Sequence, residues 1–258
     1  MTAALKKNFT DGPIFLRMLT FALPLMASAI LQILYNAADK MIVGQFSGDT
    51  TALAAIGCTG TANALIINLL IGVSGGAGVL VAQHYGAGRE DEVRRTVRTS
   101  MLVSLIGGIA FMLIGIAVAE PLMRFVAKDE LVEKATLYLA ITCCGLPAAS
   151  VYNFGSSILR ATGDSRTPLI IGIVAGLLNV GLNLVFVACF DMTVDGVAVA
   201  TVISQYFSAI AVMSSNTYFT ALSLLTLIRI GTRAYFLRWD ISLKKYLVST
   251  YAFGSNAR

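Results

Sequence analysis

Residues 101–119 read MLVSLIGGIAFMLIGIAVA, an apolar stretch without a single charged side chain. A helix needs about 20 such residues to cross the hydrocarbon core of a bilayer. The run around this stretch extends over residues 97–119, and five comparable runs occur at residues 14–42, 52–82, 135–159, 169–190 and 196–213. The sequence therefore predicts an all-α polytopic membrane protein with six transmembrane helices.

The composition supports this class over any soluble one. Of the 258 residues, 57% are hydrophobic and only 13% are charged, whereas soluble domains carry about 25% charged residues. A disordered chain, a disulfide-stapled secreted domain and a nucleic-acid-binding module are all excluded. We expect membrane lipid as a partner and no nucleic acid.

The basic residues are distributed unevenly between the two predicted sides of the membrane. One side collects Lys6, Lys7, Arg17, Arg89, Arg94, Arg95, Arg98, Arg160, Arg166, Arg229, Arg233, Arg238, Lys244, Lys245 and Arg258, and the other holds Lys40, Arg124, Lys128 and Lys134. Cytoplasmic loops carry an excess of Lys and Arg. The pattern predicts a multi-pass protein of the cell (plasma) membrane with both termini in the cytoplasm, and it accounts for the net charge of +5.

Asp39 is the acidic residue that stands out within a predicted span, near the outer end of the first helix. A carboxylate in the bilayer is costly and is a functional-site hypothesis by default. The alternative is an interfacial ion pair between Asp39 and the neighbouring Lys40. The sequence alone leaves both interpretations open.

Two other spans carry polar pairs at helical spacing. Asn179 and Asn183 in the fifth span, and Thr201 and Gln205 in the sixth, are four residues apart, and such residues share one helix face. One interpretation is hydrogen bonding between helices. The other is a site, built with Asp39, that binds a proton or a sodium ion, because hard cations prefer oxygen ligands.

Pro24 lies in the middle of the first span. Proline removes one backbone hydrogen bond and should kink or weaken the helix at that point. Pro24 is therefore a candidate hinge for a helix that also carries Asp39. A static kink satisfied by neighbouring helices is the alternative.

Catalytic and metal-binding patterns are missing from the sequence. There is no Ser/His/Asp set, His84 is the one histidine, and the glycine cluster 72–78 lacks the Gly-Lys-Ser/Thr ending of a phosphate-binding loop. We expect no enzyme activity, no metal site and no cofactor. Active transport by this chain would draw on an ion gradient.

Several glycines have the spacing that lets helices approach closely in lipid. They are the pairs Gly72/Gly76 and Gly172/Gly176, together with Gly107, Gly108 and Gly115. We expect tight helix packing at most of these positions.

Six motifs occur in a fixed order along the chain. They are Gly12-Pro13 through Leu23-Pro24, Tyr35–Asp39 with Val43-Gly44, Gly75–Gly88, Arg160–Pro168, Leu178-Asn179 with Leu182-Asn183, and Gly196–Ala198 leading to Ala200-Thr201. In this order, from about Gly12 to Val212, they resemble the N-terminal half of a multidrug and toxic compound extrusion (MATE) family transporter.

This resemblance implies a secondary antiporter that expels small organic, often cationic, compounds or drugs in exchange for protons or sodium ions. The family fold has twelve helices in two six-helix lobes around a central cleft, so residues 1–213 would form one lobe. The family's first-helix acidic residue matches Asp39, its fifth-helix asparagine matches Asn179 and its sixth-helix threonine matches Thr201. Many members have an aspartate where this chain has Asn183, which leaves one carboxylate fewer at the site.

The resemblance also suggests a mechanism. Burial favours the protonated form of Asp39, and protonation would remove the charge that Asn179 and Thr201 solvate. The packing of the first helix would change, with Pro24 as the bend. A lipid-linked polysaccharide flippase of the same superfamily, which usually has a more basic cleft, and a non-transporting membrane scaffold are the alternatives.

The loop from Arg160 to Pro168 allows two interpretations. Arg160, Asp164 and Arg166 could form a gating ion pair on the cytoplasmic side. They could instead be a positive-inside anchor, with a Gly-Asp turn and a proline at the start of the next helix. The anchor interpretation is favoured.

The motifs end after Met213. Residues 218–230 are too short an apolar run for a normal span, and residues 233–245 are basic with aromatics, as suits a membrane surface. We expect residues 214–258 to be an atypical extension with a basic cytoplasmic tail. A truncated gene or fragment is favoured over a half that pairs with itself or with a separate six-helix half, and an inactive fragment is an alternative to the antiporter function.

Overall fold

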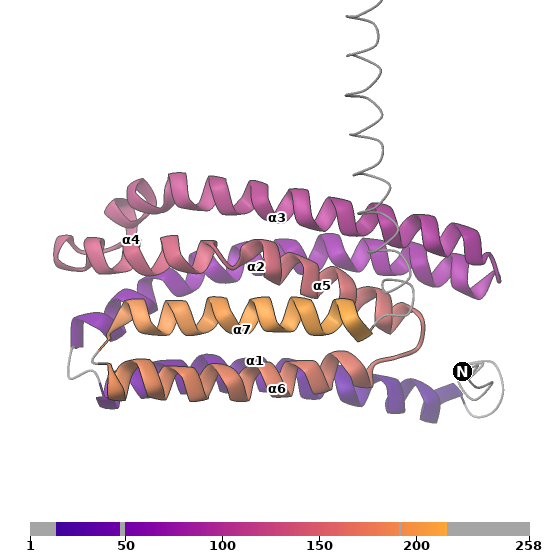
Figure 1. Cartoon of the computed structure of the whole chain (residues 1–258), viewed down its shortest axis with the longest axis horizontal. Helices are drawn as coiled ribbons and strands as arrows, with labels where there is room; N and C mark the ends of the chain where they lie inside the picture. The colour runs from indigo at the N-terminus through magenta and orange to yellow at the C-terminus, as the bar shows by residue number, and fades with distance from the viewer. Residues whose placement is uncertain (1–13, 47–49, 191, 216–258) are drawn as a thin grey trace, which may run out of the picture. The chain divides into compact units, whose positions relative to one another are not determined.

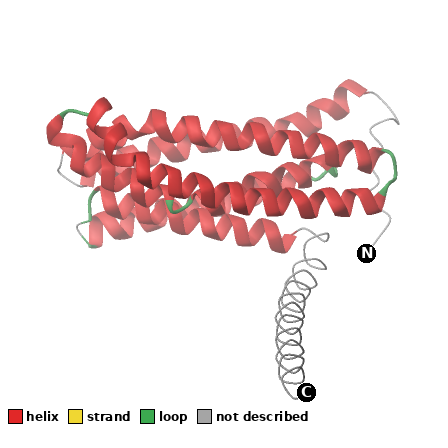
Figure 2. Cartoon of the chain, turned by 90° about the horizontal axis from the view of Figure 1, so that it is seen from above, coloured by secondary structure: helices red, strands yellow, loops and turns green. Residues whose placement is uncertain are grey.

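A computed structural model of the chain describes residues 14–46, 50–190 and 192–215. These ranges are helical and contain no strand (Figure 2). In chain order the elements are α1 (Ile14–Phe46), α2 (Thr50–Gly86), α3 (Glu90–Val126), α4 (Asp129–Cys143), α5 (Leu146–Ala161), α6 (Arg166–Leu184), the π-helical turn η2 (Val185–Cys189) and α7 (Val194–Ser215). The predicted all-α class is confirmed, and the expected tail beyond Ser215 lies outside the described residues.

The helices cover the predicted spans, and their ends differ from the predicted ones by up to seven residues. Four segments are long and apolar enough to cross a membrane: α2 from Thr51, α3, α6 with η2, and α7. The pair α4 and α5 makes a fifth candidate span, bent by 47°. Helix α1, with 33 residues, covers the remaining predicted segment.

The fourth predicted span is broken, which corrects the expectation of one helix over residues 135–159. The chain tightens at the break, where Gly145 N–H donates to the Thr142 carbonyl, three residues back, at 3.0 Å. Pro147, two residues later, has no N–H with which to continue the helical bonds of α4. A glycine and a proline two residues apart therefore end α4 and start α5 in a new direction.

Successive segments run in opposite directions, with α4 and α5 forming one segment (Figure 1). The start of α1, the α2–α3 and α5–α6 connections and the end of α7 consequently lie at one end of the bundle. That end carries Arg89, Arg94, Arg95, Arg98, Arg160 and Arg166, and the opposite end carries Lys40, Arg124, Lys128 and Lys134. The basic residues of the two predicted sides thus stand at opposite ends of the described bundle.

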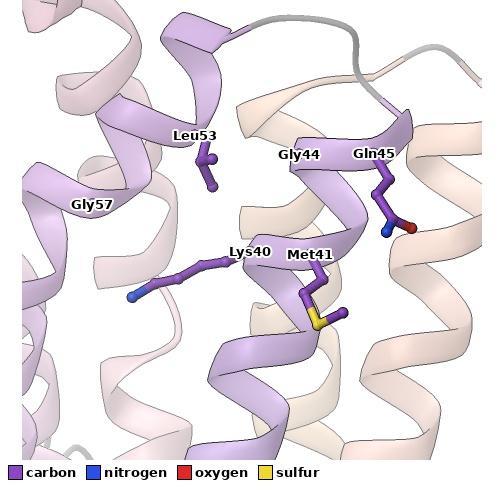
Figure 3. A pocket seen from close by; sticks show the side chains of 6 residues that line it. All are labelled: Lys40, Met41, Gly44, Gln45, Leu53 and Gly57. Carbon is purple, nitrogen blue, oxygen red and sulfur yellow. The ribbon is translucent and has the colours of Figure 1, made fainter.

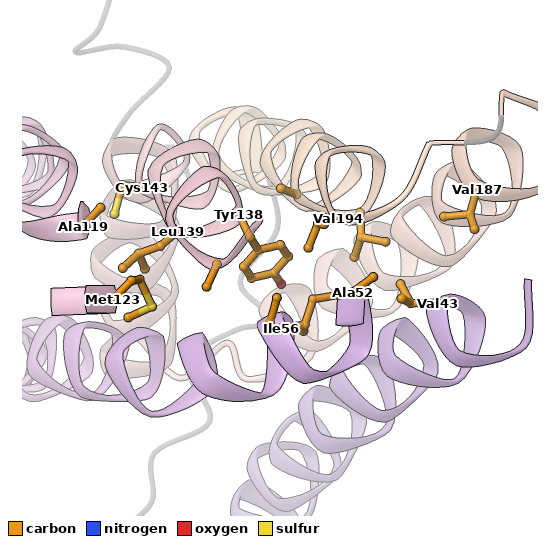
Figure 4. Packing of buried hydrophobic residues seen from close by; sticks show 14 of the residues in the cluster. Val43, Ala52, Ile56, Ala119, Met123, Tyr138, Leu139, Cys143, Val187 and Val194 are labelled. Carbon is orange, nitrogen blue, oxygen red and sulfur yellow. The ribbon is translucent and has the colours of Figure 1, made fainter. Parts of the chain in front are cut away.

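Helix α1 packs mainly on α6, α6 packs on α7, and α5 packs on both α2 and α3. The largest buried cluster includes Val43, Ile56, Tyr138, Val187 and Val194, which come from α1, α2, α4, η2 and α7 (Figure 4). This cluster joins the helices at the end of the bundle where α1 finishes and α2 begins. It includes Ile42 and Val43, in the turn of α1 that follows Asp39.

Large apolar side chains also cover the outside of the bundle. On α3, Leu102, Ile106 and Leu113 are exposed by 50%, 67% and 59% of their surface. Soluble monomers rarely leave a large contiguous apolar patch uncovered. An apolar exterior of this kind is suited to lipid and agrees with a membrane-spanning bundle.

The glycine prediction holds at some positions and fails at others. A Cβ on Gly108 would lie 2.7 Å from the Pro147 Cα, so α3 and α5 approach closely there. Gly115 faces the Cys143 side chain of α4 in the same tight manner. For Gly72, Gly76 and Gly107 the prediction is wrong, because no described atom of another element lies within 4 Å of a Cβ placed there.

Candidate ion-coupling site

Asp39 is buried within the bundle, although it lies on a helix with many exposed side chains. Its exposed fraction is 9%, and Ile42 and Val43, in the next turn of α1, are also buried. The contact of α1 with α6 creates this burial. Because a buried carboxylate loses its hydration, it needs hydrogen-bond donors from the protein.

Helix α6 supplies the donor. Asn183 is fully buried, and its Nδ2 donates to Asp39 Oδ1 at 2.5 Å. The same nitrogen lies 3.3 Å from Oδ1 of Asn179, one turn earlier on the same face of α6. The predicted i, i+4 pair therefore forms one continuous polar strip beside Asp39.

Thr201 of α7 extends the strip to a third helix. Asn179 Nδ2 lies 3.4 Å from the Thr201 hydroxyl oxygen, at the long end of hydrogen-bond distances. The Thr201 hydroxyl in turn donates to the Val197 carbonyl at 2.9 Å. The four predicted site residues, Asp39, Asn183, Asn179 and Thr201, are thus brought together in a single hydrogen-bonded chain across α1, α6 and α7.

Lys40 does not pair with Asp39. Within the described ranges the one ion pair joins Arg124 to Glu120 on the surface of α3, at 2.6 Å. Lys40 instead extends toward a pocket of about 530 Å³ between α1 and α2, together with Met41 and Leu53 (Figure 3). The interfacial ion-pair interpretation of Asp39 therefore does not describe the structure.

The first helix continues through Pro24 without a break in its helical assignment. The Ser28 hydroxyl donates to the Pro24 carbonyl at 2.8 Å, one turn later. Serine bonds of this type often bend helices slightly. Pro24 and Ser28 together mark a locally weakened stretch of α1, about four turns before Asp39.

The predicted gate residues make local contacts. Both carboxylate oxygens of Asp164 accept hydrogen bonds at the start of α6, from Arg166 N–H at 3.1 Å, Thr167 N–H at 3.0 Å and the Thr167 hydroxyl at 2.6 Å. Arg160 Nε donates to the Ser156 carbonyl at 3.0 Å. None of the three forms an ion pair within the described chain, so the geometry fits the capping and anchor interpretation.

Most of the site residues lie in a segment that matches a known protein family. The family model MatE matches residues 24–185, which is well over half of the chain and includes Asp39, Asn179 and Asn183. The chain belongs to the MatE family. The family resemblance inferred from the six motifs is confirmed, and Thr201 lies beyond the matched segment.

Relatives of this MatE chain are named as multidrug resistance and multidrug export proteins. It is 29% identical over 202 residues to "Probable multidrug resistance protein YpnP" of Bacillus subtilis, covering 77% of this chain and 44% of that protein. It is 30% identical over 210 residues to "Multidrug export protein MepA" of Staphylococcus aureus, covering 78% and 45%. The chain spans less than half the length of these curated relatives.

Solved structures that resemble this chain include MATE family transporters. A multidrug resistance MATE family transporter in its outward-facing conformation matches with a TM-score of 0.73 at 26% identity, over 78% of this chain and 46% of that one. The MatE fold is therefore shown, and the described helices correspond to about half of such a transporter.

Two tyrosines near Asp39, and a third near the start of α6, were missed from the sequence. The Tyr35 ring sits over Gly176, and its hydroxyl donates to the Ile173 carbonyl at 3.3 Å. Tyr138 of α4 lies close enough to Asp39 for the two groups to interact electrostatically. Tyr35 lies one turn before Asp39, a spacing that could have identified it. No local pattern marks Tyr138.

The third tyrosine and the remaining polar candidate lie on other helices. The Tyr152 hydroxyl donates to the Pro168 carbonyl at 3.1 Å, close to Gly172. The Gly172/Gly176 pair therefore accommodates tyrosine side chains. Gln205 is not part of the Asp39 chain: its Oε1 faces Gly145 at the α4–α5 break.

The described residues offer no group of three or more His, Cys, Asp or Glu side chains that could hold a metal ion. Asp39, two amides and a hydroxyl are the polar groups that the site provides. Such a set can bind and release a small cation at one carboxylate. It lacks a nucleophile with an adjacent base, as acyl transfer would require.

Proposed function

We propose that this chain provides one lobe of a secondary antiporter that exports small organic, often cationic, compounds in exchange for protons or sodium ions. The observation that carries the proposal is the buried Asp39 carboxylate, held by Asn183 and linked through Asn179 to Thr201. The names of the relatives as multidrug resistance and export proteins support the class of cargo.

The coupling follows from the charge of Asp39. While Asp39 is ionised, burial makes its hydrogen bond with Asn183 important, because a buried charge is stable only when it is paired. Binding of a cation neutralises the carboxylate and changes its hydrogen bonding with the α6 amide. Helix α1 can then change its packing, with the stretch around Pro24 as the bend, and the cleft releases its cargo outward.

The second wall of the cleft is part of the same proposal. Two-lobed carriers bind their substrates at the interface between repeats. We infer that the α1, α6 and α7 lobe works with a separate six-helix half or with a second copy of itself. The flippase alternative finds no support in the relatives, and a basic cleft is not what Asp39 with two amides provides.

The proposed setting is the plasma membrane. The end of the bundle that carries Arg89, Arg94 and Arg160 would face the cytoplasm, since positive residues are retained on that side. Asp39 lies toward the opposite end of α1 and would receive its cation from outside. A protease-accessibility measurement on oriented vesicles tests this orientation.

The function is tested by efflux of a fluorescent organic cation from liposomes that contain the chain. We expect efflux when a pH or sodium gradient is imposed, and its loss in Asp39→Asn without loss of membrane insertion. Asp195→Asn is the matched control, because Asp195 caps the start of α7 by accepting from Thr193 N–H at 3.0 Å. Efflux from Asp39→Asn at the wild-type rate contradicts the assignment. If neither gradient drives efflux in the wild type or in any variant, the chain is a scaffold or an inactive fragment.

A further inference from the structure

The two polar atoms of the Asn183 side-chain amide differ in their hydrogen bonding. Its nitrogen contacts both Asp39 Oδ1 and Asn179 Oδ1, at 2.5 and 3.3 Å. Its oxygen is fully buried and accepts no hydrogen bond in the described part of the chain. Buried polar atoms are nearly always paired, and an exception calls for an explanation.

The other polar groups of the site direct donors to other acceptors. Asn179 Nδ2 faces Thr201, the Thr201 hydroxyl donates to the Val197 carbonyl, and the Tyr35 hydroxyl donates to the Ile173 carbonyl. The group that lies against the Asn183 amide and has no proton when ionised is Asp39. A proton taken up by Asp39 creates a new donor at this place.

Few other titratable or charged groups lie on the helix segments near Asp39. Helix α4 contributes Tyr138, and α1 itself contributes Tyr35 and Lys40, of which Lys40 points to the pocket between α1 and α2. Helix α6 presents amides to Asp39, and α7 contributes the hydroxyl group of Thr201 to the same series of hydrogen bonds. The site therefore has a single acid, flanked by neutral hydrogen-bonding groups.

We propose that Asn183 makes this site selective for a proton. Water delivers H⁺ to the Asp39 carboxylate, an O–H bond forms, and that O–H donates to Asn183 Oδ1. The other Asp39 oxygen keeps accepting from Asn183 Nδ2, so acid and amide form a pair with two hydrogen bonds. No covalent bond of the protein breaks. This inference rests on the proposed function and specifies its coupling ion.

The same atoms form a poorer binding site for a sodium ion. Hard metal cations take several oxygen ligands, and the oxygens of Asn179 and Thr201 already face amide nitrogens at 3.3 and 3.4 Å. The Asp39 carboxylate and Asn183 Oδ1 are the oxygen ligands that remain for a metal ion. An aspartate at position 183 would add a second carboxylate and remove the amide donor, so residue 183 decides between the two ions.

Difference infrared spectroscopy between high and low pH tests the pair directly, on the full chain in lipid. A protonated carboxyl band that disappears in Asp39→Asn belongs to Asp39. In Asn183→Leu this band is expected at a higher wavenumber, because the acid has lost its acceptor. Asn153→Leu is the matched control, since Asn153 donates only to the Ala149 carbonyl of its own helix, at 2.8 Å. An unshifted band in Asn183→Leu overturns the proposal.

Labelling of asparagine with ¹³C at the side-chain carbonyl gives a second measurement, which needs no variant at position 183. The carbonyl band of an asparagine that gains a donor moves to a lower wavenumber at low pH. We expect this movement in the wild-type chain and in Asn153→Leu, and its loss in Asp39→Asn. A labelled spectrum that does not change with pH overturns the proposal even if Asn183→Leu does not fold.

Transport separates this inference from the proposed function. Under a pH gradient, Asn183→Leu should export the cation about tenfold more slowly than wild type, as expected for loss of the one hydrogen bond that forms only when Asp39 is protonated. Asn183→Asp should gain export driven by sodium alone. Equal driving of the wild type by sodium and by pH overturns the proton assignment. Correct infrared shifts without any export contradict the antiporter function and leave the acid–amide pair intact.

Discussion

Replacement of Gly176 by alanine probes the contact that holds α1 against α6. The new methyl group would lie inside van der Waals contact with three carbons of the Tyr35 ring, Cζ, Cε1 and Cε2. The ring must move, and its hydrogen bond to the Ile173 carbonyl, already long at 3.3 Å, is lost with it. Because Tyr35 lies one turn before Asp39, the Asp39–Asn183 bond is strained as well.

The magnitude follows from two contributions. Overpacking of a well-packed site costs about 1–3 kcal/mol, and a lost hydrogen bond costs about 0.5–1.5 kcal/mol. Glycine to alanine in a helix also stabilises by up to about 1 kcal/mol. That gain is shared by Gly72→Ala on α2, where a Cβ meets nothing within 4 Å. We therefore expect Gly176→Ala to be about 2–4 kcal/mol less stable than Gly72→Ala.

Thermal unfolding in detergent measures this difference, and about 2–4 °C per kcal/mol is expected for a chain of this size. In a Tyr35→Ala background the ring is absent, so Gly176→Ala should cost no more than Gly72→Ala. Such non-additivity is the signature of a direct contact. Equal melting temperatures of Gly176→Ala and Gly72→Ala in the chain with Tyr35 would refute the ring–glycine contact.

Three further substitutions test other parts of the structure. Asp164→Ala removes the cap of α6 and should lower stability by about 1 kcal/mol without changing the efflux rate; a changed rate at unchanged stability would favour a gate. Thr201→Val leaves Asn179 Nδ2 without its acceptor and should lower stability by about 1–3 kcal/mol, whereas Thr201→Ser should not; equal unfolding of both variants contradicts the α6–α7 link. Glu120→Gln breaks an exposed ion pair and should leave the melting temperature unchanged; a clear drop would show that the pair is structural.

The helical segments and the members of the site could be predicted from the sequence for local reasons. Apolar runs of membrane length give the helices, and a period of 3.6 residues places Asn179 and Asn183 on one face. The scarcity of charge within the spans singles out Asp39. Thr201 was placed correctly by the family motif, although its spacing to Gln205 alone suggested a pair that the structure does not form.

Other features depend on contacts between distant segments and have no local signal. The packing partner of a glycine cannot be inferred from its spacing, so Gly72 and Gly76 were expected to contact a helix and Gly176 was not expected to receive Tyr35. The bend between α4 and α5 has a local cause in Gly145 and Pro147, but the apolar run continues across it and suggests one helix. The unpaired oxygen of Asn183 depends on three helices at once.

The two contacts of α1 with α6 respond differently to a bound cation. Tyr35 holds its place by shape and by a neutral hydrogen bond to Ile173, and neither depends on the charge of Asp39. The Asp39–Asn183 bond does depend on it, because charge-assisted hydrogen bonds are about twice as strong as neutral ones. Protonation replaces this one charge-assisted bond by the two neutral hydrogen bonds of the acid–amide pair, so cation binding should rearrange one contact and retain the other. We expect α1 to pivot about Tyr35 without detaching from α6, and labels on either side of Tyr35 should report unequal displacements when the pH is lowered.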